Sequence, residues 1–305
     1  MTVKRLNRIR LTGEDHAVNS VCLLICLIMA FVCVYPLYYT LINSLNDGKD
    51  AARGGIYLWP RVFSLENYKT VVSDQSLPLS FVITALRTFI GTASSLFFTA
   101  MVSYALSRKN LIFRRFYIFA GLITMYIGGG VIPTYVLYRQ LSLINTFWVY
   151  VVPSIYSFGY GILMMNFFIK LPESLIESAR IDGASDFKIL FRVVLPLSKP
   201  MLATMALFIG VGHWNDWFTS AYYVVDEKLM TMPAALMRLL TEADAVARMK
   251  EILGVNSAAS QMQYTVTADS VRYATLIVSV MPITVLYPFL QRYFIHGMML
   301  GSLKE

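Results

Sequence analysis

Long uncharged, apolar stretches alternate with short charged ones along this chain of 305 residues. Residues 17–46 contain no charged side chain, and 20 uncharged residues separate Arg87 from Arg108. An α-helix rises about 1.5 Å per residue, so about 20 apolar residues cross the roughly 30 Å hydrocarbon layer of a bilayer. The pattern predicts an all-α polytopic membrane protein with six transmembrane helices, at 20–45, about 88–107, 116–138, 147–168, 200–223 and 272–291.

Lysine and arginine are unevenly distributed over the segments that connect these helices. Segments 1–19, 107–115, 169–199 and 292–305 hold 15 of them, whereas segments 46–79, 139–146 and 223–270 hold nine over a greater length. Because basic residues are retained on the cytoplasmic side of a membrane, we expect the first set in the cytoplasm, with both chain termini. The expected order is a cytoplasmic segment 1–19, an extracytoplasmic loop 46–79, a membrane core 80–292 and a cytoplasmic tail 293–305.

The composition supports a membrane protein and argues against a water-soluble globular protein and a nucleic-acid-binding protein. The chain is 57% hydrophobic and 14% charged, with a mean hydropathy of +0.58, which is too apolar for a water-soluble globular surface. Retention of basic loops in the cytoplasm explains the net charge of +8 better than nucleic-acid binding does. Cys22, Cys26 and Cys33 lie at helical spacing in the first apolar stretch with no histidine among them, so we expect packing residues and no metal or redox site.

A charged insert, residues 170–199, separates the fourth and fifth predicted helices. Pro172 suits the first turn of a helix, and Gly183 permits the positive φ that would stop this helix after Ile181. The insert predicts a helical hairpin in water whose apolar side chains fill a groove on a soluble partner. These side chains are Leu175, Ile176, Ile181, Phe187, Leu190 and Phe191.

The second half of the insert carries its own start and stop signals. Ser185 or Asp186 is expected to cap a second helix that runs toward Val194. Pro196 lacks a backbone N–H and is expected to end that helix.

Seven positions of the insert resemble the E-A-A-x3-G-x9-I-x-L-P motif in the permease subunits of ABC importers. They are Glu177, Ser178, Ala179, Gly183, Val193, Leu195 and Pro196. Ser178 replaces the first alanine and Val193 the isoleucine, and both keep residue size. The resemblance implies that the hairpin docks into a cleft on a separate ATP-hydrolysing subunit, through the coupling residues Glu177, Ala179, Asp182, Gly183, Ala184, Leu195 and Pro196.

The fifth predicted helix contains the most polar intramembrane cluster of the chain. Polar groups at membrane depth usually face a cavity or a partner, tryptophan rings stack on sugar rings, and Asn and Asp bind hydroxyls. This makes Trp214, Asn215, Asp216 and Trp217 candidates for a carbohydrate pathway. Two other readings stay open: the cluster serves as interfacial anchors and helix-end groups, or His213 and Asp216 bind a metal or relay a proton.

Three glycines, Gly128 to Gly130, interrupt the third predicted helix. Each glycine costs about 1 kcal/mol of helix stability relative to alanine, and a break inside a membrane is tolerated where protein or a wet cavity satisfies the backbone. Gly129 therefore either lines the pathway or allows close helix packing.

Two long loops are expected outside the cell. In 46–79, Tyr57 and Trp59 suit the membrane interface and Pro60 sets a turn. This loop is similar to that of carbohydrate-importing ABC permeases, where a leucine-tryptophan-proline turn precedes an asparagine-tyrosine pair, here Asn67 and Tyr68. The mixed composition of 223–270 predicts short helices over the outer mouth.

The sequence holds no G-x-x-x-x-G-K-[ST], H-E-x-x-H or G-x-S-x-G motif, so we expect a non-catalytic subunit. Nearly the whole chain is similar to a binding-protein-dependent inner-membrane permease of carbohydrate-uptake ABC importers, like the second permease of maltose-type systems. Its glycine-rich third helix resembles the subgroup associated with oligosaccharides and polysaccharide fragments.

This resemblance implies a location in the bacterial cytoplasmic membrane and four kinds of partner. They are a second homologous permease, two ATPase subunits, an extracytoplasmic solute-binding protein and a carbohydrate substrate. It also implies alternating access, with no cofactor on this chain and with ATP and Mg used by the ATPase. A proton-coupled secondary sugar carrier, a non-sugar ABC permease for amino acids or peptides, and a structural or assembly protein remain alternatives.

Overall fold

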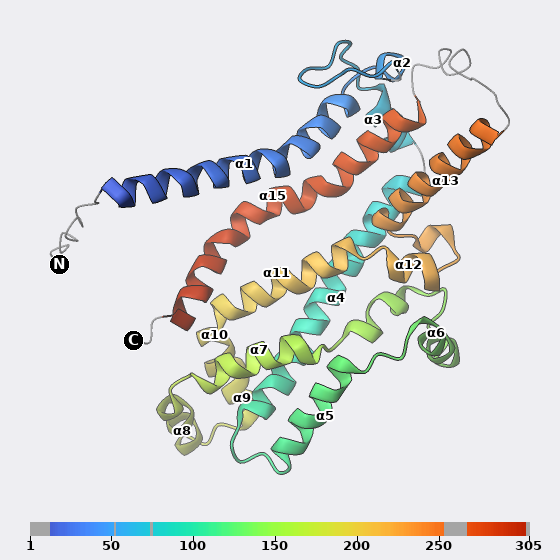
Figure 1. Cartoon of the computed structure of the whole chain (residues 1–305). Helices are drawn as coiled ribbons and strands as arrows, with labels where there is room; N and C mark the ends of the chain where they lie inside the picture. Colours follow the sequence, from blue (N-terminus) through green and yellow to red (C-terminus); the bar gives the residue numbers. More distant parts are fainter. Residues whose placement is uncertain (1–12, 52, 74–75, 253–266, 303–305) are drawn as a thin grey trace. The chain divides into compact units, whose positions relative to one another are not determined.

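The computed structural model describes residues 13–51, 53–73, 76–252 and 267–302 (Figure 1). Every regular element in these ranges is helical, and an isolated bridge pairs Asn46 with Phe63. The longer helices are α1 (Gly13–Ser44), α4 (Ser76–Ser107), α5 (Arg114–Tyr126), α6 (Val131–Gln140), α7 (Phe158–Ile169), α8 (Glu173–Ile181), α11 (Lys199–Asn215), α13 (Met232–Ile252) and α15 (Ala268–Ser302). The shorter ones are α2 (Gly48–Ala51), α3 (Glu66–Ser73), η1 (Phe147–Tyr150), η2 (Val152–Ser154), α9 (Asp186–Ile189), η3 (Leu190–Val194), α10 (Leu195–Leu197), α12 (Phe218–Tyr223) and η4 (Glu227–Leu229).

The chain divides into two compact units. One comprises residues 1–70 and 256–277, and the other comprises residues 71–255 and 278–305. Both candidate sites lie in the second unit. The predicted segment 1–19 and tail 293–305 fall partly outside the described residues, but α15 extends to Ser302, well past the expected end of the sixth helix at 291.

Among the described residues, two helices, α1 over residues 17–44 and α4, are long and apolar enough to cross a membrane. Up to five spans result if each of three bent helix pairs counts as one. Helix α4 begins 12 residues earlier than predicted, so Arg87 lies within the helix and not at its end. The prediction failed because it treated the charge as a boundary, whereas the fold neutralises Arg87 inside the helix.

The glycine-rich stretch breaks the third predicted helix into α5 and α6, which meet at 116°. Gly130 has a φ of +76°, a conformation that L side chains rarely adopt. A Cβ at Gly128 would meet no other described atom within 4 Å, and the nearest atom to one at Gly129 would be Pro133 Cβ, at 3.9 Å. Close helix packing within the described chain therefore does not account for these glycines.

Helix α4 is the centre of the second unit, where it packs along α7 and α11 (Figure 1). Small and hydroxylated residues allow the close approach: the Ser103 hydroxyl donates to the Gly161 carbonyl at 3.0 Å. A Cβ at Gly91 would lie 2.6 Å from the His213 imidazole, so this position of α4 has no room for a larger residue against α11. A core of buried apolar side chains joins these helices: Ala100, Tyr104, Met164, Phe168, Met205 and Ile209, among others.

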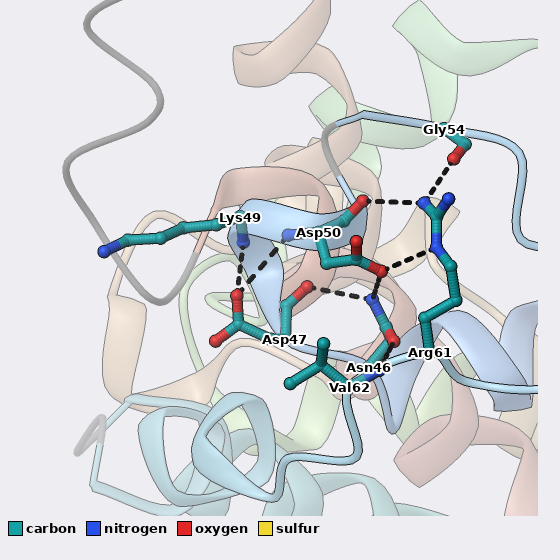
Figure 2. Close-up of polar contacts among 7 residues, drawn as sticks. All are labelled: Asn46, Asp47, Lys49, Asp50, Gly54, Arg61 and Val62. Atoms are coloured by element: carbon teal, nitrogen blue, oxygen red, sulfur yellow. Dashed lines mark hydrogen bonds and ion pairs between the residues drawn. The ribbon is translucent and has the colours of Figure 1, made fainter.

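The loop after α1 is ordered by a polar network within the first unit (Figure 2). Fully buried Asn46 donates to Asp50 at 3.0 Å and accepts from the Val62 amide at 2.9 Å. Arg61 Nε donates to the same Asp50 carboxylate at 2.9 Å and its Nη2 to the Gly54 carbonyl at 2.6 Å. The hydrogen bond from Asn46, with the nearby Arg61, lowers the pKa of Asp50 below its usual range.

Two minor expectations need revision. In the second long loop, α13 is a 21-residue helix and not a short one, although residues 253–266 lie outside the described residues. The three cysteines are exposed on α1 and free, so within the described chain they do not pack as expected.

Candidate functional site

The hairpin of α8 and α9 closes with a glycine turn, as predicted. Helix α8 ends at Ile181, and Gly183 has a φ of +76°. The Ala184 amide donates to the Ala179 carbonyl and the Gly183 amide to the Arg180 carbonyl, both at 2.9 Å. This pair of bonds is a Schellman motif, which satisfies the last carbonyls of α8 and requires a left-handed residue at Gly183.

The second half of the hairpin differs from the prediction at Pro196. Ser185 is the cap of α9, and its hydroxyl accepts from the Lys188 amide at 3.4 Å. The helix does not end at Pro196: it continues through the π-helical turn η3 and α10 to Leu197, and α11 follows at a bend of 85°. The Leu195 amide bonds to the Leu190 carbonyl, five residues back, and such widened turns allow a proline to follow without breaking the helix.

The apolar hairpin residues divide into two groups. Ile176 and Leu190, which were expected to enter a partner, are buried in the core with Ile189 and Val194. Ala179, Ala184 and Leu195 pack at the edge of this core. Four others remain on the surface: Leu175, Ile181, Phe187 and Phe191, with Ile181 87% and Phe187 62% exposed. One face of the hairpin thus packs into the core, and the opposite face is exposed at the surface.

The charged residues of the hairpin lie at its surface. Arg180 pairs with Asp186 across the turn at 3.1 Å, and Lys109 approaches Glu173 at 3.8 Å. Glu177 and Asp182 are exposed, and the Glu177 carboxylate pairs with no described residue. Glu177 was expected to pair with a basic group either on the ATPase or within the hairpin, and the described hairpin supplies no such pair.

A polar cavity of about 760 Å³ lies between α4, α5, α6, α7 and α11. Its walls include Arg87 from α4, Tyr138 from α6, Tyr150 from η1, and His213 and Asp216 from the end of α11. Sequence reasoning found Asp216 and missed Arg87, Tyr138 and Tyr150. No local pattern could have linked Arg87 to Asp216, because 129 positions separate the two residues.

Arg87 and Asp216 form an ion pair at the cavity wall. Arg87 Nη2 donates to the Asp216 carboxylate and Nη1 to the Asp216 carbonyl, the latter at 2.8 Å. The guanidinium is 3% exposed and stacks on the Tyr150 ring, with its Cζ 4.7 Å from the ring centroid. Asp216 also accepts from the Thr219 amide at 3.1 Å and from the Thr219 hydroxyl at 2.5 Å.

This ion pair stabilises a break in the fifth predicted helix. Helix α11 ends at Asn215, Asp216 has extended backbone angles, and α12 starts at Phe218. Arg87 satisfies a carbonyl at the break and Asp216 satisfies an amide of the following turn. A discontinuous helix with its polar groups bonded in this way is tolerated at membrane depth beside a cavity.

The four predicted pathway residues of the fifth helix point in different directions. Asp216 lines the cavity, whereas Trp214 faces away from it: its ring packs edge-on against Phe81 and its Nε1 donates to the Ser279 carbonyl at 3.0 Å. Asn215 and Trp217 are exposed and line no part of this cavity. Gly129, the fifth predicted residue, is also exposed and lies outside the lining.

The described chain supplies no third ligand for a metal ion at His213 and Asp216. Within the described residues, no group of three or more His, Cys, Asp or Glu side chains is placed to hold a metal ion. The His213 imidazole packs against Gly91, and the Asp216 carboxylate binds Arg87.

Residues 62–299 match the family described as binding-protein-dependent transport system inner membrane component. The chain belongs to this family. Its membership confirms a multi-pass permease of the inner, cytoplasmic membrane that is a non-catalytic subunit of a transport system. A permease that depends on a binding protein implies that protein and an ATPase as partners.

Three similar proteins cover almost all of the permease. The polygalacturonan/rhamnogalacturonan transport system permease YtcP of Bacillus subtilis is 32% identical over 91% of this chain and 95% of its own length. The arabinooligosaccharides permease AraQ of Halalkalibacterium halodurans is 28% identical over 90% and 93%. A bacterial ABC transporter involved in the import of the acidic polysaccharide alginate has a chain with a TM-score of 0.82 at 27% identity, covering 93% of the permease and 98% of that chain.

Proposed function

We propose that this permease forms half of the membrane pathway of an ATP-driven importer of oligosaccharides or polysaccharide fragments. It pairs with a second, homologous permease, two ATPase subunits and an extracytoplasmic solute-binding protein. The names of its relatives support a carbohydrate substrate. The polar cavity supports the same class, because its tyrosine rings and hydroxyls match the apolar faces and hydroxyl groups of sugars.

In this proposal the permease has six spans, with both termini and the hairpin 170–199 in the cytoplasm. The distribution of basic residues and the position of the hairpin between two apolar segments support this topology. In this topology the six spans are α1, α4, the bent pair of α5 and α6, the bent stretch from η1 to α7, α11 and α15.

The hairpin couples the permease to the ATPase. The observation that carries this role is its two-sided packing: Ile176 and Leu190 fix it to the core around α4, while Glu177, Ile181 and Phe187 are exposed for a partner. When ATP closes the two ATPases, their grooves move the hairpins and the core helices follow, so the cavity alternates between the two sides of the membrane. The permease itself needs no cofactor, and ATP and Mg serve the ATPase.

Charge reversal and backbone strain test this coupling. We expect Glu177→Lys and Gly183→Pro to abolish sugar uptake by the assembled transporter while its ATP hydrolysis continues, because proline cannot adopt a φ of +76°. Glu173→Lys is the matched control, since Glu173 is exposed on the same helix and lies outside the coupling residues. Normal sugar uptake by Glu177→Lys and Gly183→Pro, at normal abundance of the protein, would refute the coupling role of the hairpin.

A further inference from the structure

The two formal charges of the cavity wall neutralise one another. Among the described lining residues, Arg87 is the one arginine or lysine and Asp216 the one carboxylate, and they are paired. The other polar lining consists largely of neutral hydroxyls, including those of Tyr138, Tyr150 and Tyr156. Apart from the tyrosines, His213 is the remaining titratable residue of the described lining, and its imidazole is held against Gly91.

Asp216 already neutralises the charge of Arg87. Both terminal nitrogens of Arg87 donate to Asp216 and one face of the guanidinium is covered by the Tyr150 ring, while Nε is buried and bonds to no described atom. A carboxylate that entered the cavity would lose part of its hydration and meet no unpaired cation among the described lining residues. Partial burial of a carboxylate without a counter-charge disfavours binding by about tenfold or more.

We propose that this cavity accepts the uncharged part of a saccharide and that Asp216 determines this specificity by keeping Arg87 neutralised. The inference rests on the proposed function, in which the cavity is part of the sugar pathway. It differs from what the names of two similar proteins suggest, because alginate and polygalacturonan are both acidic polysaccharides. Hydroxyls of a neutral sugar find donors and acceptors in the tyrosine, serine and threonine side chains of the wall.

Matched sugar pairs test the proposal on the intact complex. The permease would be purified with its partner permease and ATPases in nanodiscs, without the binding protein, so that binding reports the membrane pathway. The probes are trisaccharides of galactose, mannose and glucose, each paired with the trimer of the corresponding uronic acid. We expect the wild-type complex to bind at least one neutral trimer at least tenfold more tightly than its acidic counterpart.

Three variants separate specificity from folding. Asp216→Asn leaves the charge of Arg87 without its counter-charge, so we expect this variant to narrow or reverse the preference for the neutral trimer over the acidic one. The double variant Arg87→Gln/Asp216→Asn removes both charges, so we expect it to keep the preference for the neutral trimer. Asp226→Asn is the control, since Asp226 is exposed and outside the cavity. Each preference is a ratio of affinities within one preparation, so a loss of folded protein does not alter it.

The outcomes distinguish the two proposals. Tighter binding of an acidic trimer by the wild type would overturn the inference. An unchanged preference in Asp216→Asn would overturn it as well, and the wild-type comparison decides alone if that variant does not assemble. Failure of the wild-type complex to bind any of the six sugars would count against the carbohydrate function itself.

Discussion

Trp214 Nε1 donates a hydrogen bond to the carbonyl of Ser279 at 3.0 Å and thereby joins α11 to α15. The ring is 8% exposed and packs against Phe81 on the side of α11 away from the polar cavity. Trp214 is therefore a packing residue of the helix bundle, although the sequence suggested a sugar contact. Residues 214–217 do not line a single cavity of the described chain.

Truncation of Trp214 and of Trp217 should reduce the stability of the permease by unequal amounts. Trp214→Ala removes a buried ring and is expected to destabilise the permease by about 3–5 kcal/mol. Trp217→Ala removes a side chain that is 38% exposed, so we expect a loss of less than about 1 kcal/mol. Thermal unfolding of the purified complex measures both. Equal loss of stability, or loss of uptake in Trp217→Ala alone, would contradict the packing role of Trp214.

The ion pair between Arg87 and Asp216 should show strong energetic coupling. Asp216→Asn leaves the buried Arg87 charge without its partner and is expected to cost about 3–5 kcal/mol. Arg87→Gln is expected to cost less, because the Asp216 side chain is 28% exposed and keeps its bonds from Thr219. The double variant should cost less than the sum, because both charges leave the cavity wall together. Unfolding of the four proteins gives the coupling energy.

An exposed ion pair provides the control for that cycle. Arg238 and Glu227 lie 2.6 Å apart, but each is more than half exposed. Their coupling is expected below about 1 kcal/mol. A coupling of the same size at both pairs would mean that burial does not strengthen the bond between Arg87 and Asp216.

The sequence predicted the local parts of the hairpin and missed its long-range parts. Gly183 and Ser185 were identified because a left-handed turn and a helix cap depend on neighbouring residues alone. Pro196 was misjudged because a proline signal does not reveal the π-helical turn that precedes it. The inward orientation of Ile176 and Leu190 depends on α4 and α7, which lie far away in sequence.

The cavity shows the same division between local and long-range features. A polar cluster in an apolar helix was visible in the sequence, and Asp216 does line a cavity. Its ion pair with Arg87 was not predictable, because nothing in one sequence shows which of several arginines reaches it. The break of α11 after Asn215 has a local signal that was missed, because Asp216 accepts from the Thr219 amide of the following turn. The bond from Arg87 on α4 to the Asp216 carbonyl is the part that the sequence does not show.

The loop around Asn46 should loosen in acid. The pKa of Asp50 is lowered by its hydrogen bond from Asn46 and by Arg61, so the carboxylate stabilises the loop fully above the usual value of about 4. This contribution, below about 1 kcal/mol, is lost as the pH falls through the lowered pKa. We expect protection of the Val62 amide from hydrogen exchange, normalised to intrinsic rates, to fall below pH 4.

Asp50→Asn provides the comparison for that experiment. It removes the titrating group, so the protection of Val62 should already be reduced at pH 7 and change little with pH. A pH profile in Asp50→Asn identical to that of the wild type would show that another group controls the loop.

Uptake into proteoliposomes tests the central claim most directly. The permease is expected to move a labelled oligosaccharide only when its partner permease, ATPases and binding protein are present and ATP is supplied on the hairpin side. No uptake is expected for the permease alone under a proton gradient. Movement of the sugar by the permease alone, without ATP, would contradict the account.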